Sequence, residues 1–350
     1  MNKTIIAGVG KYIPEKVVTN LDLIQVMDTT DEWIQERTGI KERRHAKRFE
    51  ETTATIGAKA AEMAIKNAGI SKDDVDFIVF ATLSPDYYFP GCGVLVQRLL
   101  NLKEIGALDI RNQCSGFIYG MSVADQFIKT GMYKNILVIG SEIHSYALDY
   151  STRGRNVSVI FGDGAGAVLL QASPSSDRGI LSTHLHSDGS NAEILSMPNP
   201  GFHAGAHNQK WKPQVDETNP YANLFINQAL VDSEDHFPYM DGQSVFKKAV
   251  VKMPEVIHEA LTKNGFQESD IDMLITHQAN LRISQYMQQK LGLSDKQVFN
   301  NIQYYGNTTA ASVPIALCEA WEHGRIKEGD LVCLAAFGSG FTWGSVLMKW

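Results

Sequence analysis

Residues 64–79 read AIKNAGISKDDVDFIV, and residues 260–275 read ALTKNGFQESDIDMLI. The two stretches share one pattern, in which a helix ends at a glycine, an acidic turn follows and an apolar strand begins. The two glycines, Gly69 and Gly265, are 196 residues apart. Because self-similarity along a chain is the mark of an internal repeat, this pair predicts that one α/β unit occurs twice.

Two candidate buried helices also match. Cys114 lies 17 residues before Gly131, and Asn307 lies 17 residues before Gly324. Both intervals are apolar and rich in small residues, as buried helices are, and an apolar strand is expected after each. In a duplicated fold the N-termini of two such helices become partners. We therefore expect Cys114 and Asn307, each taken as the start of its helix, to lie near each other.

A third match comes in the same order, between FGDGAGAVLL at 161–170 and FGSGFTWGSVLM at 337–348. Together the matches predict two α/β halves, roughly residues 1–175 and 176–350, related by a pseudo-twofold axis. Chance similarity between βα units is the alternative. The run GDGAG at 162–166 lacks the full spacing of a dinucleotide-binding loop, so we interpret it as tight backbone packing near the active site.

The composition disfavours several classes of protein. Hydrophobic residues make up 44% and charged residues 20% of the 350, which is typical of a globular protein. The net charge of −7 disfavours a nucleic-acid partner. No apolar run reaches the length of a membrane span, and the N-terminus lacks the pattern of a signal peptide. The four cysteines lack CxxC pairing and nearby histidines, which argues against a metal site and disulfides and predicts a cytoplasmic location.

Three reactive or polar side chains are expected at strand ends or helix starts. Cys114 lies in LDIRNQCSGF, where a strand runs into a helix, and a helix N-terminus is expected to favour its thiolate, the form that attacks thioesters. His277 ends an apolar strand, and Asn307 begins a helix. Open α/β sheets place their sites at such positions. Taken singly, the three residues have ordinary interpretations as a buried cysteine, a structural histidine and a helix cap.

In combination, these residues and their neighbours resemble β-ketoacyl-acyl carrier protein synthase III, a family of condensing enzymes in the thiolase superfamily. The resemblance runs nearly end to end and rests on six stretches: DEWIQERTGIKERR at 31–44, CSGF at 114–117, FGDGAGA at 161–167, HQANLRI at 277–283, YGNTTAAS at 305–312 and GSGFTWGS at 338–345. It implies the thiolase fold, layered α-β-α-β-α, and a homodimer.

The resemblance also implies a reaction in two halves. The Cys114 thiolate attacks an acyl-CoA and expels CoA. Malonyl-acyl carrier protein then loses CO2 and attacks the acyl-enzyme, which gives a β-ketoacyl-acyl carrier protein. Neutral His277 and the Asn307 amide are expected to donate hydrogen bonds to the enolate oxygen, and the backbone N–H groups of Cys114 and Ser339 to form the oxyanion hole. The resemblance implies no cofactor and no metal.

Three further sets of residues match binding positions of the family. The set implied to contact CoA, through indole stacking on adenine and arginine pairing with phosphate, is Trp33, Arg37 and Arg153. The position implied to shape the acyl pocket across the dimer interface is Phe89. The set implied to dock the acidic acyl carrier protein is Lys247, Arg282 and Lys290.

The chain departs from the pattern of the family that it resembles in two places. Small residues usually precede the cysteine, whereas Arg111, Asn112 and Gln113 stand there in this chain. Residues of about 200 to 238 look like an insertion without periodicity, and long irregular loops are often lids or binding loops. We hypothesise that the insertion reshapes the acyl entrance and permits a primer longer than acetyl. A surface elaboration is the alternative.

Other functions stay open at this point. Related enzymes transfer acyl groups to oxygen or nitrogen, join two long acyl chains or prime polyketide synthesis. A thioester hydrolase would use His277 as a base to the thiol, and a non-catalytic CoA- or carrier-binding protein would use neither. A biosynthetic thiolase is disfavoured because it needs a second cysteine in the turn that reads GSGFTW at 338–343. The presence of both His277 and Asn307 favours the decarboxylating reaction.

Overall fold

Two β-sheets form the framework of the computed structural model, which describes residues 3–173, 177–198, 218, 228–233 and 236–350. The first sheet has the order β1-β7-β6-β4-β5, with bounds Lys3–Tyr12, Gly164–Ser173, Asn135–Glu142, Phe77–Ala81 and Gly106–Ile110. The second has the order β11-β12-β13-β8, with bounds Met273–Thr276, Leu331–Gly338, Thr342–Lys349 and Gly179–Ser187. Two short pairs complete the strands: β2 (Lys16–Thr19) with β3 (Glu42–His45), and β9 (Leu195–Ser196) with β10 (Tyr239–Met240).

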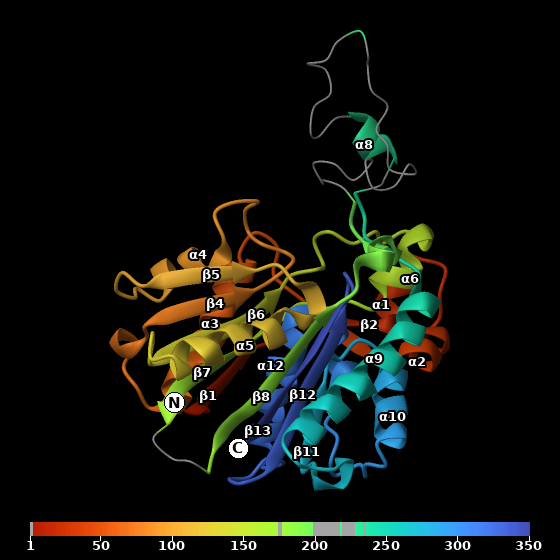
Figure 1. Ribbon diagram of the computed structural model, residues 1–350. Helices are drawn as coiled ribbons and strands as arrows, with labels where there is room; N and C mark the ends of the chain where they lie inside the picture. Colours follow the sequence, from red (N-terminus) through yellow and green to blue (C-terminus); the bar gives the residue numbers. More distant parts are fainter. Residues whose placement is uncertain (1–2, 174–176, 199–217, 219–227, 234–235) are drawn as a thin grey trace.

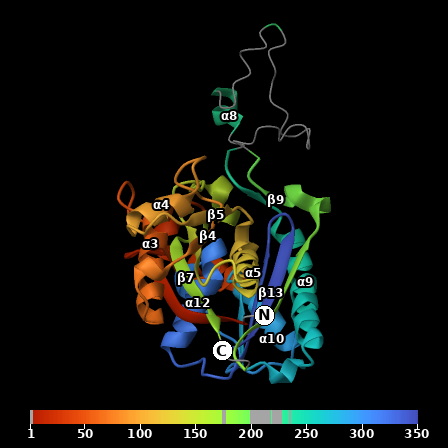
Figure 2. The same cartoon turned by 60° about the vertical axis from the view of Figure 1, so that its left-hand side comes forward.

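Helices separate and cover the two sheets, as Figures 1 and 2 show. Those that pack on the sheets are α3 (Thr53–Ala68), α4 (Cys92–Leu99), α5 (Gly116–Lys129), α9 (Gly242–Lys263), α10 (Leu281–Lys290) and α12 (Ser312–Glu322). The other described α-helices are α1 (Asn20–Leu23), α2 (Asp31–Thr38), α6 (Arg155–Ser158), α8 (Gln228–Ser233) and α11 (Ile302–Tyr305). Helices α5 and α12 lie between the sheets, α3 and α4 cover the outer face of the first sheet, and α9 and α10 cover the outer face of the second. The layers follow the expected order α-β-α-β-α.

Burial on both faces explains why the central strands are continuous apolar runs. In β6, Ile136 and Val138 face the helices between the sheets, whereas Leu137 and Ile139 face the outer helices. Successive side chains of a strand point to opposite faces, so a strand covered by helices on both sides needs no polar positions. The apolar run ends only at the carboxyl end of β6, where the chain reads SEIH.

The strand directions of the second sheet repeat those of the first. β4 pairs with β6 in parallel, as β11 pairs with β12, and β7 and β13 are each antiparallel to these partners. The edge strands β1 and β8 are again antiparallel to β7 and β13. This repeated topology favours the predicted duplication. The division into halves at about residue 175 stays a prediction, although the first sheet ends at Ser173 and the second begins at Gly179.

The starts of the two matched helices differ from the expectation. Gln113 and Thr309, 196 residues apart, both have a left-handed backbone, with φ of 46° and 44°, and each opens a short 3-10 turn before its helix. The match of Cys114 with Asn307 is therefore wrong by three residues, and Cys114 corresponds to Ala310. The predicted match counts back from the glycines that follow the two helices. Because α12 has 11 residues and α5 has 14, this count pairs residues that do not correspond at the helix starts. Asn307 lies in the loop before the turn.

Most of the predicted insertion at about 200–238 lies outside the described residues. Only Thr218, α8 and residues 236–238 of this segment belong to them. The hypothesis that the insertion reshapes the acyl entrance therefore stays a prediction. Within the part of the chain that the structure describes, no helix is long and apolar enough to span a bilayer.

Two of the three glycines in the GDGAG run, Gly162 and Gly166, lie against the backbone of the second half. A Cβ atom added at Gly162 would lie 2.1 Å from the carbonyl oxygen of Tyr305, and one at Gly166 would lie 2.6 Å from the backbone nitrogen of Ile315. Only glycine permits backbones to approach so closely. These contacts confirm the interpretation of the run as tight backbone packing.

We expect Gly166→Ala to destabilise the fold, because the new methyl group would push β7 away from α12. Overpacking of this kind costs about 1–3 kcal/mol in the free energy of unfolding. Gly189→Ala is the matched control, because a Cβ there meets no atom within 4 Å and the backbone φ is not left-handed. Denaturant unfolding of both variants measures the difference, and equal stability of the two would contradict the packing argument.

Candidate active site

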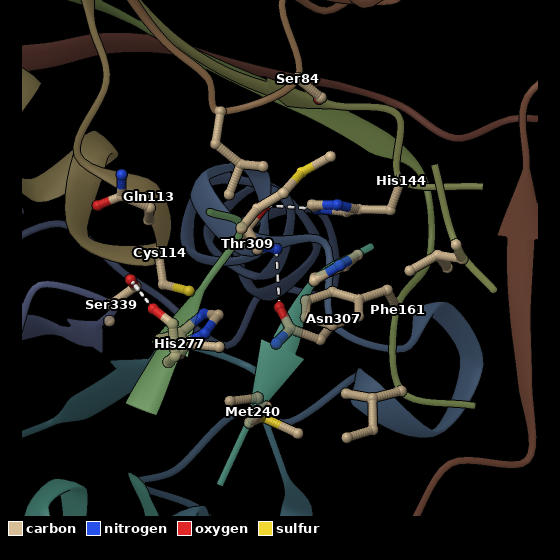
Figure 3. A pocket seen from close by; sticks show the side chains of 18 of the residues that line it. Ser84, Gln113, Cys114, His144, Phe161, Met240, His277, Asn307, Thr309 and Ser339 are labelled. Atoms are coloured by element: carbon tan, nitrogen blue, oxygen red, sulfur yellow. Dashed lines mark hydrogen bonds between the residues drawn. The ribbon is translucent and has the colours of Figure 1, made fainter. Parts of the chain in front are cut away.

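A cavity of about 1930 Å3 opens where residues of both sheets meet. Cys114 reaches it from the first half of the chain, and His277 and Asn307 reach it from the second. Figure 3 shows that these three side chains face one shared space. The structure therefore brings together the three residues that the sequence singled out.

Cys114 lies in the 3-10 turn between β5 and α5 and is almost completely buried. Its sulfur lies within hydrogen-bonding reach of two backbone N–H groups, its own and that of Ser339. The turn after β12 can come this close because Gly338 has no side chain: a Cβ there would lie 2.8 Å from the Cβ of Cys114. The Ser339 hydroxyl points away and donates to the carbonyl oxygen of Leu195. The backbone N–H, rather than the serine side chain, thus faces the sulfur.

The protonation state of the Cys114 thiol differs from the expectation. Burial, and secondly the carboxylate of Glu142, raise the pKa of the Cys114 thiol to about 12, although the N–H groups of Ser339 and Cys114 act in the opposite direction. The prediction that a helix N-terminus favours the thiolate is therefore wrong for the site as a whole, because desolvation of the charged form outweighs the local donors. Cys114 therefore rests as a thiol at neutral pH.

His277 follows β11 and is held by backbone and side-chain hydrogen bonds. Its N–H donates to the carbonyl oxygen of Ala335 over 2.8 Å, and its Nδ1 lies 2.7 Å from the hydroxyl oxygen of Ser312. The same oxygen accepts from the N–H of Gln278 over 3.4 Å. Among the described residues the Ser312 hydroxyl meets no acceptor other than Nδ1, so it donates to Nδ1, and this leaves the ring proton on Nε2. Burial lowers the pKa of His277 to about 3, so the ring is neutral.

Asn307 is held in the loop between α11 and α12. Its N–H donates to Ile160 over 2.8 Å, and its carbonyl oxygen accepts from Gly162 over 3.1 Å. Its side-chain Oδ1 accepts from the backbone N–H of Thr309 over 2.8 Å, the contact that Figure 3 marks. Because Oδ1 is occupied, the amide nitrogen Nδ2 is the end left for the cavity, and it makes no hydrogen bond among the described residues. The site thus presents two neutral donors beside the thiol.

Known proteins match this chain over its full length. Residues 108–189 match the family 3-oxoacyl-[acyl-carrier-protein (ACP)] synthase III, and residues 261–350 match the C-terminal part of the same family. Beta-ketoacyl-[acyl-carrier-protein] synthase III of Shigella dysenteriae serotype 1 is 44% identical over 346 residues, which cover 99% of each chain. The protein of that name from Rhodospirillum centenum is 42% identical over 351 residues, with the same coverage.

The chain belongs to the β-ketoacyl-acyl carrier protein synthase III family. The crystal structure of 3-oxoacyl-[acyl-carrier-protein] synthase III from Aquifex aeolicus VF5 has a TM-score of 0.85 and 42% identity, and the match covers 99% of this chain and 100% of that one. Xanthomonas campestris OleA shares the fold alone, with a TM-score of 0.81 at 17% identity. The thiolase fold predicted for this synthase III chain is thereby confirmed.

The predicted CoA contacts of this synthase III chain are only partly brought together. Trp33 and Arg37 line the cavity, with the guanidinium carbon of Arg37 4.8 Å from the indole centroid. Arg153 instead forms an ion pair with Asp149, with Nη2 2.6 Å from the carboxylate oxygen. The guanidinium carbon of Arg155 lies 5.4 Å from the centroid of the Trp33 ring, which is the same ring that Arg37 contacts. Sequence reasoning missed Arg155, although the run RGR at 153–155 offers both arginines equally.

The other predicted contact residues are spread over the surface. Phe89 is 81% exposed on a loop and does not line the cavity of its own chain. Lys247 on α9 and Arg282 on α10 are exposed and line the cavity. Lys290 is exposed at the end of α10 and lies away from it.

Three residues at the site were missed by sequence reasoning. They are Glu142 at the carboxyl end of β6, His144 just beyond it, and Thr309 in the turn before α12. All three lie around the loop that carries Asn307. The signal was present, because Ser141 and Glu142 end the apolar strand β6 and His144 lies just beyond it, as His277 follows β11. The rule that placed His277 applies equally to this strand end.

We expect the His277 ring to stay neutral across the physiological range, because burial holds its pKa near 3. In 15N-histidine NMR, its ring nitrogens should keep the shifts of the Nε2-protonated neutral form between about pH 5 and 8, where free imidazole titrates. The His277→Asn spectrum assigns the resonance, and imidazole in the same sample is the control. A titration midpoint within this interval would contradict the argument.

Proposed function

We propose that this chain condenses an acyl-CoA primer with malonyl-acyl carrier protein and thereby initiates fatty acid synthesis. The products are a β-ketoacyl-acyl carrier protein, CO2 and CoA. The observation that carries the proposal is the arrangement of Cys114 beside the backbone N–H of Ser339, facing the neutral donors His277 and Asn307 in one cavity. Such an arrangement suits charge that develops on oxygen at two successive steps.

In the first half-reaction the sulfur of Cys114 forms a bond to the acyl carbon, and the bond from that carbon to the CoA sulfur breaks. The thiol proton of Cys114 leaves with CoA, which departs as a thiol. The oxyanion of the tetrahedral intermediate accepts hydrogen bonds from the N–H groups of Cys114 and Ser339. Loss of one such donor typically costs about 10²–10³ in rate.

In the second half-reaction malonyl-acyl carrier protein loses CO2, and the electron pair of the broken C–C bond forms an enolate. Nε2–H of His277 and Nδ2–H of Asn307 donate to the enolate oxygen without losing their protons. The enolate carbon then bonds to the acyl carbon, and Cys114 leaves as a thiolate that regains a proton from water. Neutral donors suit this step because the enolate must stay nucleophilic.

The hydrolase alternative fits the site less well. It needs His277 to accept the proton of Cys114, whereas burial lowers the pKa of His277 to about 3 and Nδ1 is engaged by Ser312. A general base works best when its pKa lies near the operating pH. A histidine held neutral in this way suits hydrogen-bond donation better than proton abstraction.

Two binding surfaces belong to the proposal. Trp33 and Arg37 hold the CoA nucleotide, and Arg155 joins them, because it lies on the same indole. The exposed cations Lys247 and Arg282 at the cavity, together with Lys290 further out, dock the acidic carrier protein. Arg153, which the resemblance predicts as a CoA contact, is proposed to contribute less than Arg37 and Arg155, because its ion pair with Asp149 neutralises its charge.

A homodimer also belongs to the proposal. The edge strand β5 leaves one side of the first sheet unpaired, and Leu108 on it is 38% exposed. The neighbouring loop exposes Tyr87, Tyr88 and Phe89, and it is tied to β5 through the N–H of Cys92, which donates to Asp109. An open edge beside exposed aromatic side chains is suited to pairing with a second copy of the same strand. Phe89 would then reach the acyl pocket of the partner.

We expect Cys114→Ala to abolish acyl-enzyme formation and condensation, whereas His277→Ala and Asn307→Ala keep acylation. In the latter two, decarboxylation of malonyl-acyl carrier protein should fall by about 10²–10³, the usual effect of one lost donor. Intact-protein mass spectrometry with acyl-CoAs measures acylation, and product analysis measures condensation. Full condensation by Cys114→Ala would overturn the proposal.

Free acid without a ketoacyl product would favour the hydrolase, and a Cys114 that iodoacetamide leaves unlabelled would favour a binding protein.

We expect Leu108→Asp to convert the protein from dimer to monomer, because it places a charge at the unpaired edge strand. Val251→Asp is the matched control: Val251 is 49% exposed on α9, which covers the outer face of the other sheet. Light scattering after size exclusion measures the mass of each variant. A monomeric wild type, or a dimeric Leu108→Asp variant, would contradict pairing through β5.

A further inference from the structure

A buried polar network connects the end of β6 to the loop that carries Asn307. Glu142, the last residue of β6, is fully buried. Its carboxylate accepts hydrogen bonds from the hydroxyls of Thr82, over 3.0 Å, and Ser84, over 2.6 Å, and from the N–H groups of Leu83 and Ser84, over 3.2 Å each. The hydroxyl of Thr309, from the other half of the chain, lies close enough to this carboxylate to lower its pKa by hydrogen bonding. The proposed reaction assigns this carboxylate no role.

Thr309 has a conformation that needs support. Its φ of 44° is left-handed, which is unfavourable for a β-branched residue and persists only where the surroundings hold it. Its hydroxyl oxygen lies 2.8 Å from Nε2 of His144, in addition to its bond to Glu142. Its backbone N–H is the donor that holds Oδ1 of Asn307 over 2.8 Å. The side chain of Thr309 is thus held by the first half of the chain, and its backbone holds Asn307 in the second.

The hydrogen bonds of this network run in one direction. Above the pKa of Glu142, which burial raises to about 7, its carboxylate only accepts, so the single hydroxyl proton of Thr309 points to Glu142 and the Thr309 oxygen accepts from Nε2–H of His144. His144 is therefore neutral with its proton on Nε2, in agreement with burial, which lowers the pKa of His144 to about 3. In the order His144 to Thr309 to Glu142, each of the two side-chain contacts has one donor and one acceptor.

We propose that Glu142 and His144 are positioning residues for Asn307, and that they act through Thr309. They hold the Thr309 N–H against Oδ1 of Asn307, so that Nδ2 faces the enolate oxygen. An Asn307 amide released from this bond can rotate by half a turn and present Oδ1, an acceptor, to a negatively charged oxygen. This inference rests on the proposed function, in which Asn307 donates to the enolate.

The decisive variant is Thr309→Val, which keeps the β-branched shape and removes the hydroxyl. Because Asn307 acts only after acylation, decarboxylation of malonyl-acyl carrier protein should fall by about tenfold to a hundredfold, the range expected when a donor is misplaced by about 1 Å. Acylation of Cys114 by acyl-CoA should stay within about threefold of wild type. Thr309→Ser retains the hydroxyl and should restore decarboxylation. Glu142→Gln should resemble Thr309→Val when assayed at about pH 8, above the pKa of Glu142, which burial raises to about 7.

Thr82→Val is the matched control. It removes another hydroxyl that donates to the same carboxylate, over 3.0 Å, yet Thr82 makes no hydrogen bond to Thr309 or Asn307. We expect its decarboxylation rate to stay well above that of Thr309→Val, with a similar loss in melting temperature. Equal losses of decarboxylation in the two variants would overturn the proposal, because the network would then act on general stability alone.

A double-mutant cycle separates this inference from the proposed function. In the Asn307→Ala background, Thr309→Val should cause no further loss of decarboxylation, since the side chain it positions is gone. Losses that multiply would overturn the positioning role. If Asn307→Ala alone leaves decarboxylation intact, the proposed function fails. If Asn307→Ala is impaired and Thr309→Val is not, only the positioning role fails.

Discussion

The two halves of the chain meet through backbone contacts at the starts of the two central helices, and the site depends on this contact. A Cβ atom at Gly140, in β6, would lie 2.3 Å from the carbonyl oxygen of Ala310 in the turn before α12. A Cβ atom at Gly338, in β12, would lie 2.8 Å from the Cβ of Cys114 in the turn before α5. Each sheet therefore ends against the helix start of the other half, and glycine is required at both contacts because no side chain fits.

This reciprocal contact explains why neither half contains a complete site. The sulfur of Cys114, from the first half, lies beside the N–H of Ser339 from the second. The amide of Asn307, from the second half, is oriented by Thr309, whose hydroxyl bonds to Glu142 of the first. A shift between the halves would therefore disturb the proposed oxyanion donors and the proposed enolate donors together. Catalytic geometry of this kind tolerates only small displacements.

Burial sets the charge states of the site more strongly than local donors do. It keeps the rings of His277 and His144 neutral, with pKa values near 3, and it raises the pKa of Cys114 to about 12. A dry site strengthens every hydrogen bond to an oxyanion, but it also disfavours a resting thiolate. The proposed thioester exchange and decarboxylation each create transient charge on oxygen, so hydrogen-bond donors that are already fixed in place suit both steps.

The sequence by itself determined the α/β class and the repeated unit, because apolar periodicity and glycine stops are local signals. It singled out Cys114, His277 and Asn307 through their combination and the resemblance to a known family. It did not determine the register of the repeat, since α12 is shorter than α5 and the left-handed positions Gln113 and Thr309 leave no mark in composition. Only the tertiary structure decided which arginine lies on Trp33, whether burial or the helix N-terminus controls the Cys114 thiol, and that Glu142 reaches Thr309. These outcomes depend on distances between segments more than a hundred residues apart, and desolvation follows from the packing of the whole molecule rather than from neighbouring residues.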